Sequence, residues 1–241
     1  MFEDALRFPW HGERNAETLV VGGILTLVGV LFLPLLFVYG YLVRVVRQTA
    51  AGDVEAPPQF SEWGDLLVDG LVAFVISTLY ALVPGIVVTA GALLFVVPVT
   101  AVSSVGTDGG GGLLVVLGTL LALFAVVLSV ALVVATLYFV PAAIAAYART
   151  GRFGAAFEPR LLRPIVTDGR YATGWVVAVV VSFLAQVVAS AVSATGIGVV
   201  LVPFVLFYGS VAGAYAIGVG VSEFDMGEPA DEEAPASRPA V

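Results

Sequence analysis

The sequence contains no cysteine, so disulfide bonds and thiolate metal sites are excluded throughout the chain. It also contains no lysine, because all ten basic residues are arginines, and these stand against eighteen acidic residues for a formal net charge of −8. The single histidine, His11, lies in a polar N-terminal segment over residues 1–17. Thiolate groups are therefore absent, and imidazole, the commonest acid–base group and metal ligand, is limited to one residue.

The missing lysines and the excess of acids are typical of proteins from extreme halophiles, in which carboxylates hold hydration in concentrated salt. A disordered acidic tail is the alternative interpretation, since residues 222–241 hold six of the acids. Such a tail leaves the absence of lysine unexplained. We therefore expect the source to be a salt-loving prokaryote, a halophilic archaeon.

Charge of either sign is scarce: charged residues make up 12% of the chain and hydrophobic residues 60%. Soluble domains carry about 25% charged residues. A helix needs roughly 20 apolar residues to cross a bilayer, and several uncharged stretches reach that length. The sequence predicts an all-α, polytopic transmembrane helical bundle over residues 18–221, multi-pass in the cell membrane, followed by an acidic disordered tail over 222–241. The expected spans cover residues 18–43, 70–102, 113–147, 171–194 and 199–221.

The distribution of arginine favours five spans. The positive-inside rule places Arg44, Arg47 and the five arginines of residues 149–170 in the cytoplasm. That requires residues 70–102 to cross once; two short segments divided at Pro84-Gly85 would put the later arginines outside. We expect an external N-terminus and an internal tail.

Two connectors between spans are expected to lie on the membrane surface. Residues 59–70 place Phe60, Trp63 and Leu67 on one helical face, an amphipathic pattern. Residues 53–69 hold five acids and no base, whereas residues 149–170 hold five arginines. One hypothesis is that the two connectors pair with each other. The alternative is that the arginines Arg149, Arg152, Arg160 and Arg163 contact anionic lipids or a partner.

An internal repeat is visible at the ends of the chain. Residues 33–40 (LPLLFVYG) and 202–209 (VPFVLFYG) share a Pro-x4-Tyr-Gly pattern. Phe60 to Gly70 and Phe157 to Gly169 also correspond, each ending in Asp-Gly. The pattern favours a duplication with one extra helix, with chance similarity of apolar sequence as the alternative.

These segments resemble a known family. The run GYLVRVVRQTAAGDVEAPPQFSEWGDLLVDG, with its Arg-x-x-Arg, polar connector and Trp-Gly-Asp turn, is similar to the signature of domain of unknown function 4013. The later run GRFGAAFEPRLLRPIVTDGRY is similar to that family's second connector. The family comprises prokaryotic, largely archaeal, integral membrane proteins. The resemblance implies a membrane location and no established activity.

Several kinds of chemistry lack the residues that they need. The expected spans contain no Asp, Glu, Lys, Arg or His between their boundaries, which argues against proton relays and coupled transport. Ser77, Ser129 and Ser182 have no base within the spans. We therefore expect a protein that is not an enzyme, with no catalytic, cofactor-binding or metal site. Thinly spread arginines in an acidic chain also argue against nucleic-acid binding.

Small and polar residues mark faces of the later spans. Ser182, Gln186 and Ser190 lie at i, i+4 and i+8, either lining a polar cavity or, as we favour, forming interhelical hydrogen bonds. Gly209 and Gly213 form a GxxxG motif. This motif serves either packing within the bundle or, as the more specific alternative, contact with a lipid or a partner. Asp69 and Asp168 each precede a glycine, and we expect them to cap helices, with substrate binding as the alternative.

Two functions follow as expectations. The first is a non-enzymatic structural or accessory membrane protein that engages lipids, a second copy of itself in a homo-oligomer, or a membrane protein partner. The alternative is a permease or channel for a small neutral or apolar solute, with kinks at Pro34, Pro84, Pro141 and Pro203.

Overall fold

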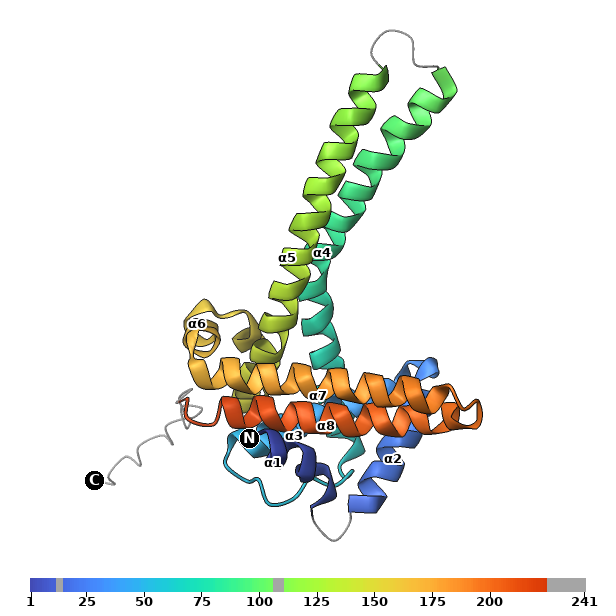
Figure 1. Ribbon diagram of the computed structural model, residues 1–241. Helices are drawn as coiled ribbons and strands as arrows, with labels where there is room; N and C mark the ends of the chain where they lie inside the picture. Colours follow the sequence, from blue (N-terminus) through green and yellow to red (C-terminus); the bar gives the residue numbers. More distant parts are fainter. Residues whose placement is uncertain (12–14, 106–110, 225–241) are drawn as a thin grey trace, which may run out of the picture. The chain divides into compact units, whose positions relative to one another are not determined.

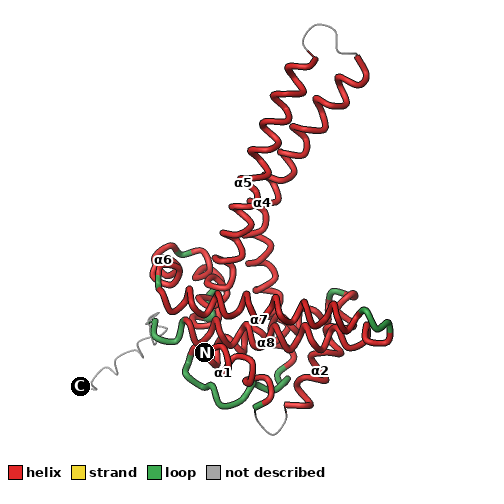
Figure 2. The backbone as a smooth tube through the Cα atoms, in the orientation of Figure 1, coloured by secondary structure: helices red, strands yellow, loops and turns green. Residues whose placement is uncertain are grey.

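A computed structural model describes residues 1–11, 15–105 and 111–224 of the chain (Figure 1). Every regular element in this part is helical, as the tube drawing also shows (Figure 2), so the predicted all-α fold is confirmed. The acidic tail beyond residue 224 and the glycine-rich 106–110 segment lie outside the described residues. The elements are α1 (Phe2–Arg7), η1 (Phe8–Trp10), α2 (Asn15–Leu27), η2 (Val28–Leu31), α3 (Leu33–Ala50), α4 (Trp63–Val105), α5 (Gly111–Thr150), η3 (Phe153–Phe157), α6 (Pro159–Thr167), α7 (Gly169–Ser193), η4 (Ile197–Leu201) and α8 (Val202–Gly220).

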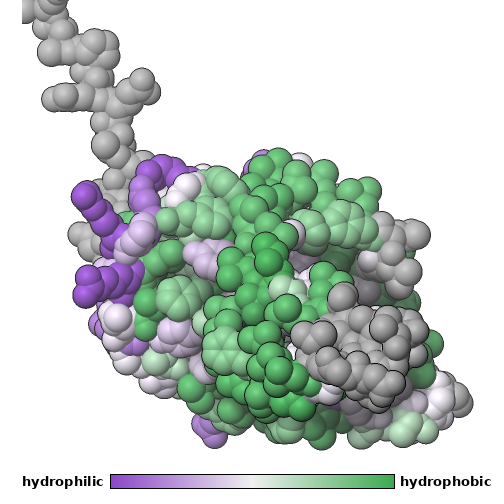
Figure 3. All heavy atoms as spheres, turned by 90° about the horizontal axis from the view of Figure 1, so that it is seen from above, coloured by the Kyte–Doolittle hydropathy of each residue, from purple (hydrophilic) through white to green (hydrophobic). Residues whose placement is uncertain are grey.

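Four helical stretches are long and apolar enough to cross a membrane: Trp63–Leu94, Val115–Thr150, Gly169–Ser193 and Gly198–Gly220. Large hydrophobic side chains on them remain exposed, such as Leu123 at 61% and Phe124 at 66%. Exposure of this kind suits lipid, because hydrocarbon chains solvate apolar side chains without cost. In Figure 3 hydrophobic residues cover most of the visible face, and hydrophilic residues gather at one edge. The chain is a multi-pass membrane protein.

The expected first span, residues 18–43, is not one helix. It is divided into α2 and α3 by the short 3-10 turn η2 and by Phe32, whose φ of 64° lies in the left-handed region. The cause is Pro34, at the start of α3, because a proline ring clashes with the carbonyl four residues earlier and provides no amide hydrogen. Helix α2 has only 13 residues, too few to cross a bilayer alone.

Helix α4 settles the alternative at Pro84-Gly85. It runs without interruption from Trp63 to Val105, so residues 70–102 form one segment rather than two. The amphipathic stretch expected to form a separate surface helix over residues 59–70 is instead continuous with this helix from Trp63 onward. A helix of 43 residues at 1.5 Å per residue is about 65 Å long, roughly twice the hydrocarbon thickness.

The helices divide into two compact units. The smaller unit, residues 77–140, consists of the later part of α4 and the earlier part of α5. Gly91 of α4 packs directly on Ala125 of α5, with no room for a side chain at Gly91. A groove of about 690 Å³ follows this contact, and its walls are almost entirely small or aliphatic side chains, among them Ala92 and Ala122.

The larger unit comprises residues 1–76 and 141–241. Helices α7 and α8 form an antiparallel pair, and α1, α2 and α3 pack on α8. The rings of Phe207 and Phe204 lie against the flat faces of Gly22 and Gly23 in α2. The buried core of this unit contains Ala5, Phe8, Val38, Tyr41, Val45, Leu66, Phe207, Val211, Tyr215 and Ala216.

The two repeated segments adopt the same local structure. Helix α3 begins after the 3-10 turn η2, and α8 begins after the 3-10 turn η4. Pro34 and Pro203 both occupy the first turn of their helix, where the absent amide hydrogen is not needed. The Pro-x4-Tyr-Gly pattern is therefore a signal for a turn followed by a new helix.

Candidate functional site

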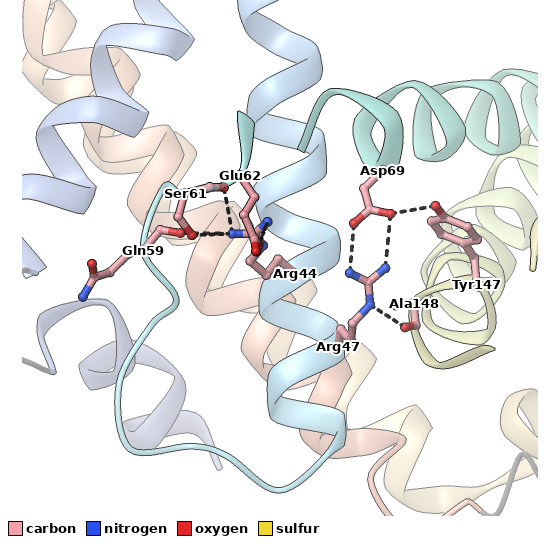
Figure 4. A network of polar contacts seen from close by, with 8 residues as sticks. All are labelled: Arg44, Arg47, Gln59, Ser61, Glu62, Asp69, Tyr147 and Ala148. Atoms are coloured by element: carbon pink, nitrogen blue, oxygen red, sulfur yellow. Dashed lines mark hydrogen bonds and ion pairs between the residues drawn. The ribbon is translucent and has the colours of Figure 1, made fainter. Parts of the chain in front are cut away.

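The end of α3 holds the polar connector that follows it. The hydroxyl of Tyr41, which is fully buried, donates to the carbonyl of Pro58 at 3.0 Å. Arg44 Nη1 donates to the Ser61 carbonyl at 2.9 Å and to Ser61 Oγ at 3.0 Å, while Nη2 contacts Glu62 Oε2 at 3.2 Å (Figure 4). The Tyr41 ring stacks on Phe60 with centroids 4.2 Å apart. These contacts fix the course of a loop that has no helix or strand of its own.

One turn further along α3, Arg47 joins three helices in what we term the charged junction, formed by Arg47, Asp69 and Tyr147. Its guanidinium makes a bidentate pair with Asp69 of α4, Nη1 to Oδ2 at 2.9 Å and Nη2 to Oδ1 at 3.2 Å (Figure 4). Tyr147 of α5 donates its hydroxyl to Asp69 Oδ1 at 2.7 Å, and Arg47 Nε donates to the Ala148 carbonyl at 2.8 Å. Asp69 and Tyr147 are buried. The carboxylate is thus fully engaged by partners from two other helices.

Two glycines allow α3 and α4 to approach closely enough for this junction. A Cβ atom on Gly40 would overlap the backbone carbonyl of Leu66, and one on Gly70 would overlap that of Leu36. The contact is reciprocal, with each helix presenting a glycine to the backbone of the other. Only glycine permits such an approach without moving a helix.

The expected role of Asp69 as a helix cap is wrong, because α4 begins at Trp63 and Asp69 lies inside it. Asp168 does cap its helix: its Oδ1 accepts from the Arg170 amide at 2.6 Å and from the Tyr171 amide at 3.4 Å. The sequence reasoning missed the charged junction. The Arg-x-x-Arg spacing, which puts Arg44 and Arg47 on neighbouring faces of one helix, was the available signal.

The arginines of the second connector have different surroundings. Arg149 donates to the Val221 carbonyl, Arg152 pairs with Glu158 at 3.4 Å, and Arg170 pairs with Glu223. Arg160 and Arg163 lie exposed on the short amphipathic helix α6, and neither forms an ion pair within the described part of the chain. The other face of α6 buries Leu162 and Ile165.

Two exposed phenylalanines accompany these arginines. Phe153 and Phe157 of η3 have exposed fractions of 42% and 38%, and their ring centroids are 5.4 Å apart. We term Arg160, Arg163, Phe153 and Phe157 the α6 surface. Its combination of arginine and phenylalanine side chains is typical of amphipathic segments that lie on a membrane surface.

The hypothesis that the two connectors pair with each other does not describe the ion pairs observed. The acids of the first connector that form ion pairs, Glu62 and Asp69, pair with Arg44 and Arg47 of α3. Arg152 pairs within its own connector. The physical reason is proximity, because the first connector folds back along the helix that precedes it.

The glycines of α8 are buried by α7. Gly209 faces Ala185, and Gly213 faces Ala178 and Ser182. Gly174 and Gly220 also meet the backbone of the opposite helix, so small residues line the whole crossing. Gly209 and Gly213 therefore pack α8 against α7, as the bundle-packing interpretation expects, and their contact with a lipid or partner stays a prediction.

The three residues of the predicted polar stripe of α7, Ser182, Gln186 and Ser190, have different surroundings. Ser182 borders a cavity of about 220 Å³ together with Tyr39 and Ser210. Ser190 Oγ donates to the Gln186 backbone carbonyl at 2.8 Å, within the same helix. Gln186 and Ser190 are exposed, and the Gln186 side chain makes no hydrogen bond to another described residue. The favoured interhelical hydrogen bonds are therefore not formed from Gln186 within this part of the chain.

No group of three or more histidine, cysteine, aspartate or glutamate side chains is placed to hold a metal ion in the described ranges. No curated protein and no solved structure matches the chain. One family matches residues 23–194, well over half of the sequence, and its description is "Protein of unknown function (DUF4013)". The match covers both connectors, the charged junction and the α6 surface. The chain belongs to the DUF4013 family of proteins of unknown function.

Proposed function

We propose that this protein is a non-enzymatic accessory protein of the cell membrane, in a halophilic archaeon, and that it engages anionic lipid headgroups through the α6 surface. The observation that carries the proposal is the exposure of Arg160 and Arg163 on a helix that buries its other face. The connector holding α6 joins α5 to α7, both long enough to span a membrane. A short connector between two spans must lie at the membrane–water boundary, which is the depth of lipid phosphates.

The chemistry of the surface matches that ligand. A guanidinium forms two parallel hydrogen bonds to a phosphate group, and it does so more specifically than an ammonium. Each arginine at an anionic surface contributes about 1 kcal/mol, so the pair supplies roughly 2 kcal/mol. In concentrated salt the Debye length falls to about 3 Å, so direct contacts survive where long-range attraction does not.

Titration of the detergent-purified protein with phosphatidylglycerol, followed by native mass spectrometry, tests the proposal. Phosphatidylcholine serves as the lipid without net charge. The R160Q/R163Q variant is expected to bind phosphatidylglycerol at least tenfold more weakly than the unmodified protein, since about 2 kcal/mol is lost. R152Q is the matched control, because Arg152 is already paired with Glu158 in the same connector. Equal phosphatidylglycerol binding by R160Q/R163Q and the unmodified protein would contradict the proposal.

One observation favours the second candidate, a permease or channel for a small neutral solute. The cavity of about 220 Å³ in the larger unit has mostly apolar walls, is bordered by Tyr39, Ser182 and Ser210, and lies beside Pro141, inside α5. It is smaller than the roughly 300–1,000 Å³ of sites for drug-sized ligands, so only a small solute would fit. Solute flux in liposomes that is abolished by filling the cavity with S182F, in a folded protein, would favour transport.

A further inference from the structure

We propose that α7 pairs with α7 of a second copy of this chain, through a seam that contains Gln186. The seam consists of residues that recur along α7 at alternating intervals of three and four. Its members are Val176, Val179, Phe183, Gln186 and Ser190, and all five are exposed. The exposed fraction of the Phe183 side chain reaches 66%. The proposal is independent of lipid binding at the α6 surface.

Helical geometry separates this seam from the face that packs on α8. The α8-facing side of α7 includes Gly174, Ala178 and Ala185. Successive residues of a helix are rotated by 100° about its axis, so the mean direction of these positions differs from that of the seam by roughly 140°. Packing within the α7–α8 pair therefore leaves the seam uncovered.

Gln186 lies too deep for water to satisfy its amide. It precedes the last residue of α7, Ser193, by seven residues, or roughly 10 Å at 1.5 Å per residue. A helix of 25 residues, about 37 Å long, extends only a few ångströms beyond a hydrocarbon core of about 30 Å at each end. An amide in hydrocarbon without a hydrogen-bond partner is strongly unfavourable, so the exposed Gln186 requires one.

A second copy fits this requirement for two reasons. A glutamine amide both donates and accepts, so two Gln186 side chains related by a two-fold axis satisfy each other reciprocally. Copies inserted in the same orientation share an axis along the membrane normal, so each seam residue faces its own counterpart. The alternating three–four spacing is also the pattern by which two helices pack at a shallow left-handed angle, the commonest crossing in membranes.

Single-cysteine cross-linking in native membranes tests the proposal, because the unmodified chain has no cysteine. V179C and S190C place the thiol on the seam. V188C is the matched control: Val188 lies two residues from Gln186, has an exposed fraction of 48%, and points about 160° from the seam. Oxidation is expected to yield disulfide-linked dimers with V179C and S190C and much less with V188C.

A second measurement separates the contribution of the Gln186 amide to dimerisation from the contribution of the apolar seam residues. Q186L is expected to reduce the dimerisation constant in detergent about tenfold, as two hydrogen bonds within a membrane imply, while Q186N retains most of it. Absence of cross-linking at both Val179 and Ser190 would show that something other than a second copy covers the seam, and would overturn the proposal. Equal cross-linking at Val188 would overturn it too, as would unchanged dimerisation of Q186L.

Discussion

Removing the charge of Asp69 is expected to destabilise the protein more than the loss of an exposed ion pair would. D69N keeps the shape of the side chain and an oxygen that can still accept from Tyr147 and from Arg47 Nη2. It removes the negative charge and replaces the acceptor of Arg47 Nη1 with an amide group that cannot accept. Breaking a fully buried pair costs about 3–5 kcal/mol. The Asp69 side chain is 11% exposed and that of Arg47 is 41% exposed, so water partly solvates the cation left behind. We therefore expect a loss of about 2 kcal/mol in the free energy of unfolding.

Reversible unfolding in mixed detergent micelles, followed by circular dichroism, measures this loss. Y147F removes one hydrogen bond to the carboxylate and is expected to cost about 1.5 kcal/mol. E62Q is the matched control, because it breaks the Arg44–Glu62 pair, in which the Glu62 side chain is 69% exposed. A pair of that kind contributes less than about 1 kcal/mol.

The junction also predicts coupling between its members. In a double-mutant cycle of D69N with R47Q, the two losses are expected to be non-additive by about 1 kcal/mol or more, since each change already breaks the same contact. If D69N unfolded within about 0.5 kcal/mol of the unmodified protein, or no more easily than E62Q, the energetic role assigned to the junction would be refuted.

Two further predictions concern packing and capping. G40A is expected to cost about 1–3 kcal/mol in unfolding free energy, because its methyl group would overlap the Leu66 carbonyl; G64A, in the open first turn of α4, is the control and should be neutral or slightly stabilising. A destabilisation by G64A equal to that of G40A would argue against the close crossing. D168A is expected to cost about 0.5–2 kcal/mol through loss of the cap of α7, with D168N nearly neutral in the same measurement. Equal losses for D168A and D168N would mean that the carboxylate acts by charge rather than as a cap.

The long spans were predictable because hydrophobic length is a local property of the sequence. Helices α5 and α7 begin and end within three residues of the expected spans 113–147 and 171–194. The break at Phe32 was missed because hydropathy does not change there, whereas the backbone requirement of Pro34 does end the preceding helix. Counting apolar residues therefore found the membrane segments and overlooked one turn.

The charged junction depended on information that is not local. Asp69 lies 22 residues from Arg47 and 78 residues from Tyr147 along the chain. Its position before a glycine resembles that of Asp168, and the same local pattern therefore suggested the same capping role for both. Gly209 and Gly213 show the same limit: their spacing predicts a close helix contact, and only the fold identifies α7 as the helix that makes it.

The orientation of the larger unit in the membrane is the most direct test of the account, since the α6 surface can meet cytoplasmic lipids only if its connector lies inside. G154C and T195C place single thiols at exposed positions before α6 and in the turn between α7 and α8. Because α7 crosses the membrane between them, an impermeant thiol reagent added to intact cells should label T195C and spare G154C. Labelling of G154C with protection of T195C would reverse the topology and contradict the proposed lipid contact, and labelling of both would show that α7 does not cross the membrane.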